Sequence, residues 1–173
     1  MQRARRNLLC GLVGLSFLIM SSKAFSWELN MILPYEDLII AAKTVWGEAR
    51  GETKKGKLAV AHVLMNRWND LGGQWAKDDT LAKTCLRPWQ FSCWNSNDPN
   101  LPKMQQVDLN DRLFGECMIA VLEAYNEPGK DPTWGSHHYI TIHLLKKGFP
   151  KSWGAKKEPV VTIGVHAFFN NVA

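Results

Sequence analysis

One carboxylate near the start of the folded chain has surroundings that suit acid–base chemistry. Glu48 lies in the stretch Trp46-Gly-Glu-Ala-Arg-Gly-Glu52, at the edge of the apolar face of a predicted helix. A carboxyl group there, beside Trp46, would stand at the rim of a cleft with its charged form poorly solvated, which suits a general acid near neutral pH. The simpler alternative is a helix-end glutamate that pairs with Arg50 or with a lysine.

A second carboxylate, Glu52, follows one helical turn later in the sequence. It is the obvious candidate if the chemistry needs two carboxylates. Gly51 is expected to end the helix between them, so the two side chains need not share a face. The competing interpretation is that Glu52 accepts hydrogen bonds from the backbone that opens the next helix, and Asp131 has a similar alternative as a turn residue.

The apolar pattern predicts the elements that must position these groups. Residues recurring at helical spacing predict three main helices. Branched and aromatic residues near the C-terminus predict strands, with Gly164 permitting a turn between them. The fold class is therefore α+β: a mainly helical domain with a small β-element. The predicted main helices are 36–49, 57–70 and 109–125, with Asp108 as the cap of the third, and a short helix is predicted at 74–83. The segment 87–103 is a predicted loop. The segment 140–145 is predicted to be a strand or short helix, and 160–163 and 165–169 are predicted strands.

The first 26 residues have the layout of a secretory signal. Three arginines precede an apolar run from Leu8 to Met20, and small residues follow it. The run is too short for a confident membrane span, although a releasable signal anchor stays possible. We therefore expect residues 1–26 to be a signal peptide or such an anchor, and residues 27–173 to be one exported domain acting in the periplasm or cell wall. Any membrane association would come only from an uncleaved signal.

The net charge of +5 depends on that segment. It holds four of the 21 Lys and Arg residues and no Asp or Glu. The rest of the chain therefore has 17 basic and 16 acidic residues, a net charge of +1. The basic balance is thus no indication of nucleic-acid binding. Of the cysteines, Cys85 and Cys93 could close a short loop by a disulfide, whereas Cys117 fits a buried apolar position.

The motifs together resemble the SleB-type cell-wall hydrolase family, known from spore cortex-lytic enzymes and phage lysins (endolysins). The resemblance begins with Trp46-Gly-Glu-Ala-Arg-Gly-Glu52 and continues through Gly56-Lys-Leu-Ala-Val-Ala-His-Val-Leu-Met-Asn-Arg67. Shorter blocks follow in the same order: Gln90-Phe-Ser92, Asp131-Pro-Thr-Trp-Gly135, His138-Tyr139, Trp153 and Ile163-Gly-Val-His-Ala-Phe168.

This resemblance implies a lysozyme-like fold and cleavage of the peptidoglycan glycan strand between N-acetylmuramic acid and N-acetylglucosamine, most simply as a lytic transglycosylase. It implies that Glu48 is the catalytic acid. A transglycosylase needs no second carboxylate, no water and no metal, so we expect no cofactor. Peptidoglycan is the expected partner, and we expect a monomer.

Several residues are candidates for binding the glycan. Gln90, Phe91 and Ser92 are expected to line the cleft, with the amide contacting acetamido groups; alternatively Phe91 anchors the loop. His138 belongs to the same candidate set. Tyr139 is a candidate donor near the cleaved bond, or else a packed aromatic. Three further residues have structural interpretations: Asn66 and Arg67 as supports of helix–helix contacts, with Asn66 satisfying loop backbone, and His166 as a core histidine.

Two other functions stay open at this point. A zinc-dependent N-acetylmuramoyl-L-alanine amidase would draw ligands from the five histidines, although no His-Glu-x-x-His helix occurs. A non-catalytic peptidoglycan-binding module would use the eight tryptophans, with a structural Glu48.

Overall fold

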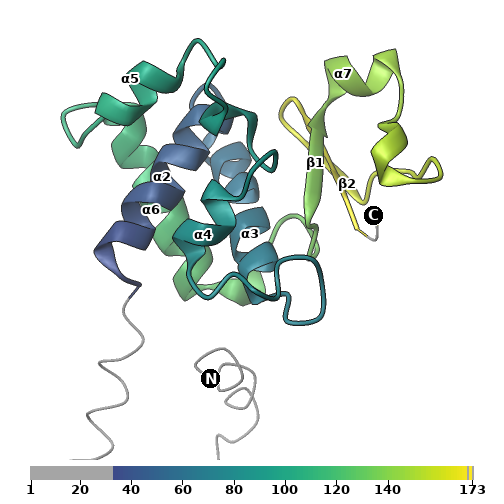
Figure 1. Ribbon diagram of the computed structural model, residues 1–173, viewed down its shortest axis with the longest axis horizontal. Coiled ribbons are helices and arrows are strands. Elements are labelled where there is room, and N and C mark those ends of the chain that lie inside the picture. The colour runs from purple at the N-terminus through teal and green to yellow at the C-terminus, as the bar shows by residue number, and fades with distance from the viewer. Residues whose placement is uncertain (1–32, 171, 173) are drawn as a thin grey trace, which may run out of the picture. The chain divides into compact units, whose positions relative to one another are not determined.

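The computed structural model describes residues 33–170 and 172. The predicted signal segment, residues 1–26, lies outside the described residues. Two groups of elements make up the domain from Tyr35 onward (Figure 1). The helical part comprises α2 (Tyr35–Ala49), α3 (Lys54–Asn69), α4 (Leu81–Leu86), η3 (Ser92–Trp94), α5 (Leu101–Gln106) and α6 (Arg112–Asn126). The short helix η4 (Pro128–Lys130) follows it. The β part comprises β1 (His138–Thr141), α7 (Ile142–Lys147), η5 (Lys151–Trp153), β2 (Val161–Ile163) and β3 (His166–Phe169).

The helical part is built around α3, which packs against both α2 and α6. Most of α3 is buried, including its polar residues Lys57, His62 and Arg67. Lys57 keeps its charge satisfied by donating from Nζ to the Glu52 carbonyl oxygen (2.7 Å) and to Glu116 Oε2 (3.0 Å). Because α3 is buried along most of its length, it lies at the centre of the domain, in contact with α2, α4 and α6.

Side-chain caps fix where the helices begin. Thr53 accepts from the Gly56 N–H at the start of α3, and Asp111 accepts from the Phe114 N–H at the start of α6. Such caps satisfy backbone donors that have no partner within the helix. The predicted cap at Asp108 was therefore wrong, since Asp111 takes that role, and α3 begins at Lys54, ahead of the predicted 57.

The region 74–107 contains more helix than predicted. The short helix expected at 74–83 lies instead at Leu81–Leu86, where Thr80 accepts from the Lys83 N–H as its cap. The predicted loop 87–103 includes η3 and the start of α5. Pro102 near the N-terminus of α5 starts a helix there, because its missing N–H lacks a helical partner in any case.

The β part is a three-stranded antiparallel sheet in the order β1-β3-β2. Its register pairs Tyr139 with Phe168, and Phe168 with Val161. Phe168 joins Ala59 and Val63 of α3 in one hydrophobic cluster, so the sheet packs on the central helix. Gly164 turns the chain between β2 and β3 with a φ of 58°.

The three cysteines among the described residues are free thiols. Cys85, Cys93 and Cys117 are all buried and unpaired, so the structure does not contain the disulfide considered for Cys85 and Cys93. Burial raises the pKa of the Cys85 and Cys117 thiols to about 12. None of the helices in the described residues has the length and apolar character to span a bilayer.

Candidate active site

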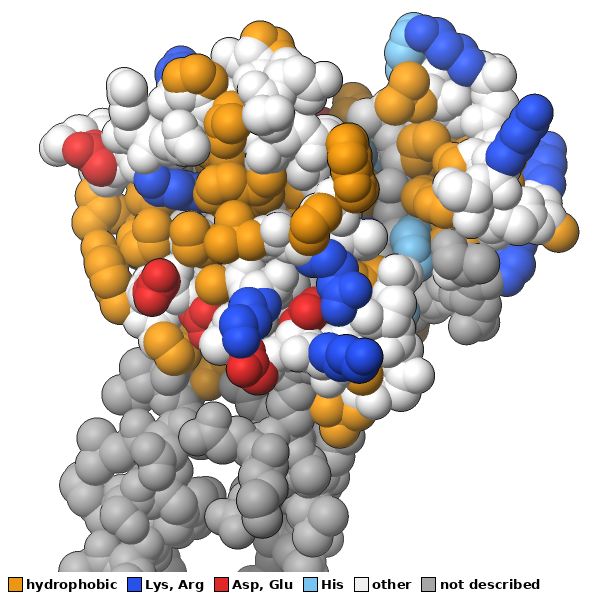
Figure 2. Space-filling view, viewed as in Figure 1, with side chains coloured by type: hydrophobic (Ala, Val, Ile, Leu, Met, Phe, Trp, Pro, Cys, Tyr) orange, Lys and Arg blue, Asp and Glu red, His pale blue; other side chains and the backbone are white. Residues whose placement is uncertain are grey.

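A cleft of about 400 Å³ lies where the helical part meets the β part. The space-filling view shows the surface hollowed between these two parts (Figure 2). Its lining is mainly polar, with a smaller share of aromatic side chains. The lining residues are Glu48, Arg67, Gln74, Trp89, Gln90, Ser92, His138, Tyr139, Ser152 and Trp153.

Glu48 projects from the last turn of α2 into this cleft and is half-buried. Its Oε1 accepts from the Cys93 backbone N–H (3.2 Å), and its Oε2 accepts from the Tyr139 hydroxyl (3.0 Å). One donor comes from the helical part and the other from the β part. The carboxyl group is therefore held in one orientation by both sides of the cleft.

Arg50, the alternative partner considered for Glu48, points elsewhere. Its guanidinium donates to Asn100 Oδ1 (3.0 Å) and lies over the Trp46 ring (4.4 Å from the centroid). Glu48 forms no ion pair with any described residue. The structure therefore does not support the interpretation of Glu48 as the ion-pair partner of Arg50.

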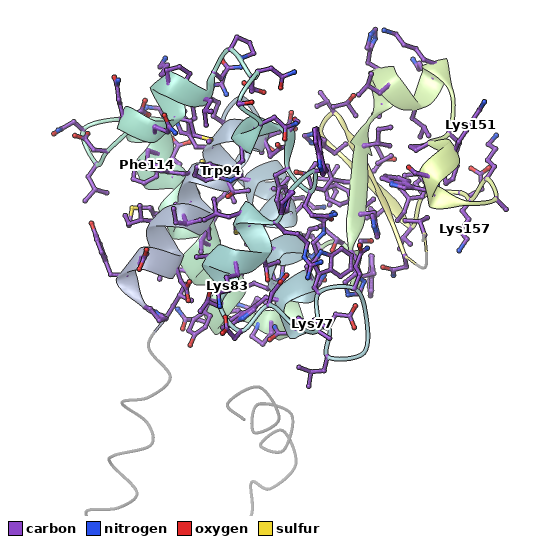
Figure 3. All side chains as sticks on the ribbon, viewed as in Figure 1. Lys77, Lys83, Trp94, Phe114, Lys151 and Lys157 are labelled. Atoms are coloured by element: carbon purple, nitrogen blue, oxygen red, sulfur yellow. The ribbon has the colours of Figure 1, made fainter. Side chains whose placement is uncertain are left out.

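The close contact between α2 and η3 depends on Gly47. A Cβ at this position would lie 2.6 Å from Cys93 Cβ and 2.8 Å from Met104 Sδ. Trp94 strengthens the same contact by donating from Nε1 to Thr44 Oγ1 (2.9 Å), and its side chain lies within the helical part (Figure 3). The absent side chain at 47 lets the Cys93 N–H reach Glu48.

Tyr139 belongs to β1 and is positioned by aromatic neighbours. Its ring lies edge-on to His166 (centroids 5.1 Å apart) and tilted against Phe168 (5.7 Å). Burial, together with the nearby Glu48 charge, raises the pKa of the Tyr139 hydroxyl well above its usual value. The hydroxyl therefore keeps its proton and remains a donor.

Arg67 is a cleft residue that the sequence analysis assigned to helix support. Its side chain is only 4% exposed, although it lines the cleft. The guanidinium lies over the rings of Trp75 (5.0 Å) and Phe91 (4.7 Å), and Nε donates to the His137 carbonyl oxygen (2.6 Å). Nη1 is buried without a hydrogen-bond partner.

The protein thus holds a desolvated cation beside Glu48. Burial lowers the pKa of Arg67 to about 10, with Tyr139, Cys85 and Glu48 opposing that shift, so the group is charged at neutral pH. A buried donor without a partner is costly, and it marks a place where a ligand could supply the acceptor.

Asn66 does act as predicted, since its amide donates to Asp131 Oδ2 (2.9 Å) and the Ser136 carbonyl (3.0 Å).

The predicted glycan-binding residues fall into two groups. Gln90, Ser92, His138 and Tyr139 line the cleft. Phe91 does not; it is 2% exposed and packs under the Arg67 guanidinium, as expected if it anchors the loop. Its direct contact with a ligand is therefore not supported.

His138 is held in the cleft wall as a neutral ring. Its ring is tilted against Trp75 (centroids 5.4 Å apart) and lies edge-on to Trp153 (5.3 Å). Burial lowers its pKa to about 4, and the charges of Arg67 and His137 add to that shift.

Glu52 is not among the cleft-lining residues. Its Oε2 accepts from the Val165 N–H (3.3 Å) in the turn between β2 and β3. A Cβ on Gly164 would lie 1.7 Å from that oxygen, so this turn needs glycine both for space and for its positive φ. Glu52 ties the β part to the end of α2, rather than capping the backbone of α3 as expected.

A metal site finds no support among residues 33–170 and 172, where no three His, Cys, Asp or Glu side chains are placed to hold an ion. His62 and His166, two of the candidate ligands, are buried, and desolvation lowers the pKa of each ring. The charge of Asp131 opposes this shift for His62, and the charges of Glu52 and Glu48 oppose it for His166. Asp131 accepts from the backbone N–H groups of Thr133 (2.7 Å) and Gly135 (2.8 Å), as predicted for a turn residue.

The site thus consists of a half-buried carboxyl group in a polar cleft, held by two donors near a desolvated cation, and such a group is a candidate for acid–base chemistry. Residues 51–169 match the family model described as Cell Wall Hydrolase, and the chain belongs to this family. Glu48 lies just before the matched range.

Curated relatives carry related names. The chain is 28% identical over 134 residues to a spore cortex-lytic enzyme of Halalkalibacterium halodurans, covering 78% of this chain and 34% of that protein. It is 30% identical over 132 residues to a spore cortex-lytic enzyme of Oceanobacillus iheyensis, and this alignment covers 76% of this chain and 41% of that protein. The alignments thus span well under half the length of these relatives.

Solved structures share the fold. The catalytic domain of the Bacillus cereus SleB protein superposes with a TM-score of 0.58 at 24% identity, covering 80% of this chain and 93% of that one. The catalytic domain of the germination-specific lytic transglycosylase SleB from Bacillus anthracis superposes with a TM-score of 0.54 at 26% identity, covering 79% of this chain and 96% of that one. The mainly helical fold with a small sheet is therefore confirmed.

Proposed function

We propose that this protein cleaves the glycan strand of peptidoglycan between N-acetylmuramic acid and N-acetylglucosamine as a lytic transglycosylase, with Glu48 as its acid and base. The observation that carries the proposal is the Glu48 carboxyl group, fixed in the cleft between the Cys93 N–H and the Tyr139 hydroxyl. Membership of the Cell Wall Hydrolase family and the activity named for the Bacillus anthracis relative support it.

The reaction needs one carboxyl group used twice. Protonated Glu48 donates its proton to the glycosidic oxygen, so that the bond from C1 of the muramic acid to that oxygen breaks and the N-acetylglucosamine leaves as an alcohol. The C6 hydroxyl of the muramic acid then attacks C1 and gives its proton to Glu48. The product is an anhydro sugar, no water is consumed, and Glu48 returns to its protonated state. General acid–base catalysis of this kind contributes roughly 10²–10⁴-fold.

The surroundings of Glu48 suit this double use. The Cys93 N–H and the Tyr139 hydroxyl stabilise the carboxylate that forms after the first proton transfer. Because the pKa of Tyr139 is raised, the hydroxyl does not compete as an anion near Glu48. Arg67 offers a fixed donor in the same cleft, suited to a carbonyl oxygen of the substrate. Gln90 and Ser92 offer an amide and a hydroxyl for acetamido and hydroxyl groups of the sugars.

Placing this activity on the cell wall requires export. We infer that residues 1–26 direct it and that residues 27–173 act outside the cytoplasmic membrane, in the periplasm or wall. Fusing residues 1–26 to a periplasmic reporter tests the first part of this inference. Cytoplasmic retention of the reporter would contradict it.

Product analysis tests the proposed chemistry. Purified protein incubated with peptidoglycan should release fragments that end in anhydro-muramic acid, lighter by one water than hydrolysed fragments. The activity should survive a metal chelator. Reducing muramic ends would mean hydrolysis, and a free stem peptide beside an intact glycan strand would mean an amidase; either result would contradict the proposal.

A further inference from the structure

The turn that leads into the Gln90 segment presents an unusual tryptophan. Trp89 lines the same cleft as Glu48, yet its side chain is 85% exposed, so it stands at the cleft mouth. Burial therefore contributes little to keeping this large apolar side chain in place. A singly exposed apolar residue is ordinary, but one at the edge of a ligand cleft has a surface available for contact.

The backbone makes tryptophan a poor choice at this position. The Gln90 N–H donates to the Arg87 carbonyl oxygen (3.2 Å), which closes a four-residue turn with Pro88 second and Trp89 third. Trp89 has a φ of 65°, and turns with proline second and a positive φ third favour glycine there. Glycine would adopt this conformation more readily, so the backbone of the turn does not explain why a tryptophan stands here.

The turn is anchored on both sides, and Trp89 is not the anchor. Before it, the Arg87 guanidinium pairs with Asp78 through two bonds, from Nε to Oδ2 (3.1 Å) and from Nη2 to Oδ1 (2.9 Å). After it, buried Phe91 packs under Arg67. The turn that carries Trp89 is therefore held in place by its neighbours on each side.

We propose that Trp89 forms a carbohydrate-stacking subsite at the mouth of the cleft, where an N-acetylhexosamine ring of the glycan strand packs on the indole face. This inference rests on the proposed function and adds a position for a sugar outside the bond that Glu48 breaks. The electron-rich face of an aromatic ring attracts the C–H bonds on the flat side of a pyranose. Gln90 and Ser92 beside it supply polar partners for the sugar's substituents.

Trp134 is a matched control within the same chain. It is also exposed (75%) and also has a positive φ (56°), but it is not among the cleft-lining residues. Its turn is held by Asp131, which accepts from the Gly135 N–H, and by Asn170, whose amide donates to the Trp134 carbonyl (3.0 Å). The two tryptophans share exposure and backbone conformation and differ in their place relative to the cleft.

Binding measured without cleavage tests the subsite. In a Glu48→Gln background, affinity for purified glycan strands stripped of stem peptides should fall about tenfold with Trp89→Ala, as for truncation of an aromatic contact residue. Trp89→Phe should retain part of the affinity, and Trp134→Ala should leave it unchanged. With Glu48 intact, Trp89→Ala should raise KM for peptidoglycan far more than it lowers kcat.

Stability separates this role from a structural one. Trp89→Gly should unfold at the same temperature as the parent protein or higher, because glycine relieves the positive φ, while losing the same affinity. Unchanged affinity in Trp89→Ala, or an equal loss in Trp134→Ala, would overturn the subsite. If the parent Glu48→Gln protein binds no glycan strand, the proposed function falls and the subsite with it.

Discussion

The two glutamates at the end of α2 have the same chemistry and different surroundings. Glu48 lies in the cleft between the Cys93 N–H and the Tyr139 hydroxyl, with the charge of Arg67 nearby. Glu52, one helical turn further along the sequence, accepts from the Val165 N–H and fills the space left by Gly164. The comparison teaches that side-chain type and spacing make both residues candidates, whereas the contacting elements separate a carboxyl group that lines the cleft from one that holds a turn.

Replacing each carboxylate tests this comparison most strongly. Glu48→Gln should lower the rate of peptidoglycan solubilisation roughly 10²–10⁴-fold, because the amide can neither give nor take the proton. Glu52→Gln should keep nearly full activity and lose about 1 kcal/mol of stability, since an amide oxygen still accepts from the Val165 N–H. Turbidity of a peptidoglycan suspension and thermal unfolding measure the two effects. An equal loss of rate in both variants would make Glu52 a second catalytic carboxylate.

The histidines near the two glutamates extend the comparison to pH. His138 faces Arg67 and His137, and its pKa is lowered from 6.5 to about 4. Between these values the unfolded chain binds a proton that the folded protein does not, so stability rises with pH through this window. Acidification should therefore remove up to about 3 kcal/mol of unfolding free energy through His138 alone.

His166 should be less sensitive, because the charges of Glu52 and Glu48 oppose the desolvation that lowers its pKa. Denaturant unfolding between pH 7 and pH 4 checks the effect. His138→Phe should flatten the pH dependence, and His143→Gln, at an exposed position on α7, should not. Identical pH curves for His138→Phe and the parent protein would contradict the assignment.

The glycines beside the glutamates provide a matched pair. Gly47→Ala forces a Cβ against Cys93, and Gly164→Ala forces one against Glu52 at a positive φ. Each should cost about 1–3 kcal/mol of stability from overpacking. Only Gly47→Ala should also lower activity, because it moves the Cys93 N–H away from Glu48. Activity per folded molecule, with folding followed by circular dichroism, distinguishes the two. Equal activity losses would show that both turns shape the cleft.

The Tyr139 hydroxyl gives the smallest expected effect. Tyr139→Phe removes one of the two donors to Glu48 and keeps the ring packed against His166 and Phe168. We expect the rate to fall about tenfold, in line with one hydrogen bond to a charged group. Tyr35→Phe, at an exposed ring outside this cleft, is the control. A Tyr139→Phe loss as large as that of Glu48→Gln would make the hydroxyl a proton donor in its own right.

The sequence predicts what depends on local pattern. Apolar residues at helical spacing predicted α2 and α6 closely, and branched residues around Gly164 predicted the β2–β3 pair. The predicted position of α4 and the predicted first residue of α6 were less accurate. Thr80 and Asp111 are residue types that commonly cap helices, and they could have indicated where these two helices begin.

Arg67 could not be assigned to the cleft in this way. Its position follows from tertiary packing: α3 is buried on most sides, and the rings of Trp75 and Phe91, which lie beyond the end of this helix, pack against its guanidinium. The only local hint was an arginine on an otherwise buried helix.

The thiol beside Glu48 has a consequence for chemical labelling of the protein. Cys93 is buried, and desolvation together with Glu48 raises its pKa far above neutrality. Oxidants and alkylating agents attack the thiolate, so this sulfur is chemically silent while the domain stays closed. Modification of Cys93 by iodoacetamide would therefore proceed only as fast as α2 and η3 separate, and its rate would measure how often the wall of the cleft opens beside Glu48.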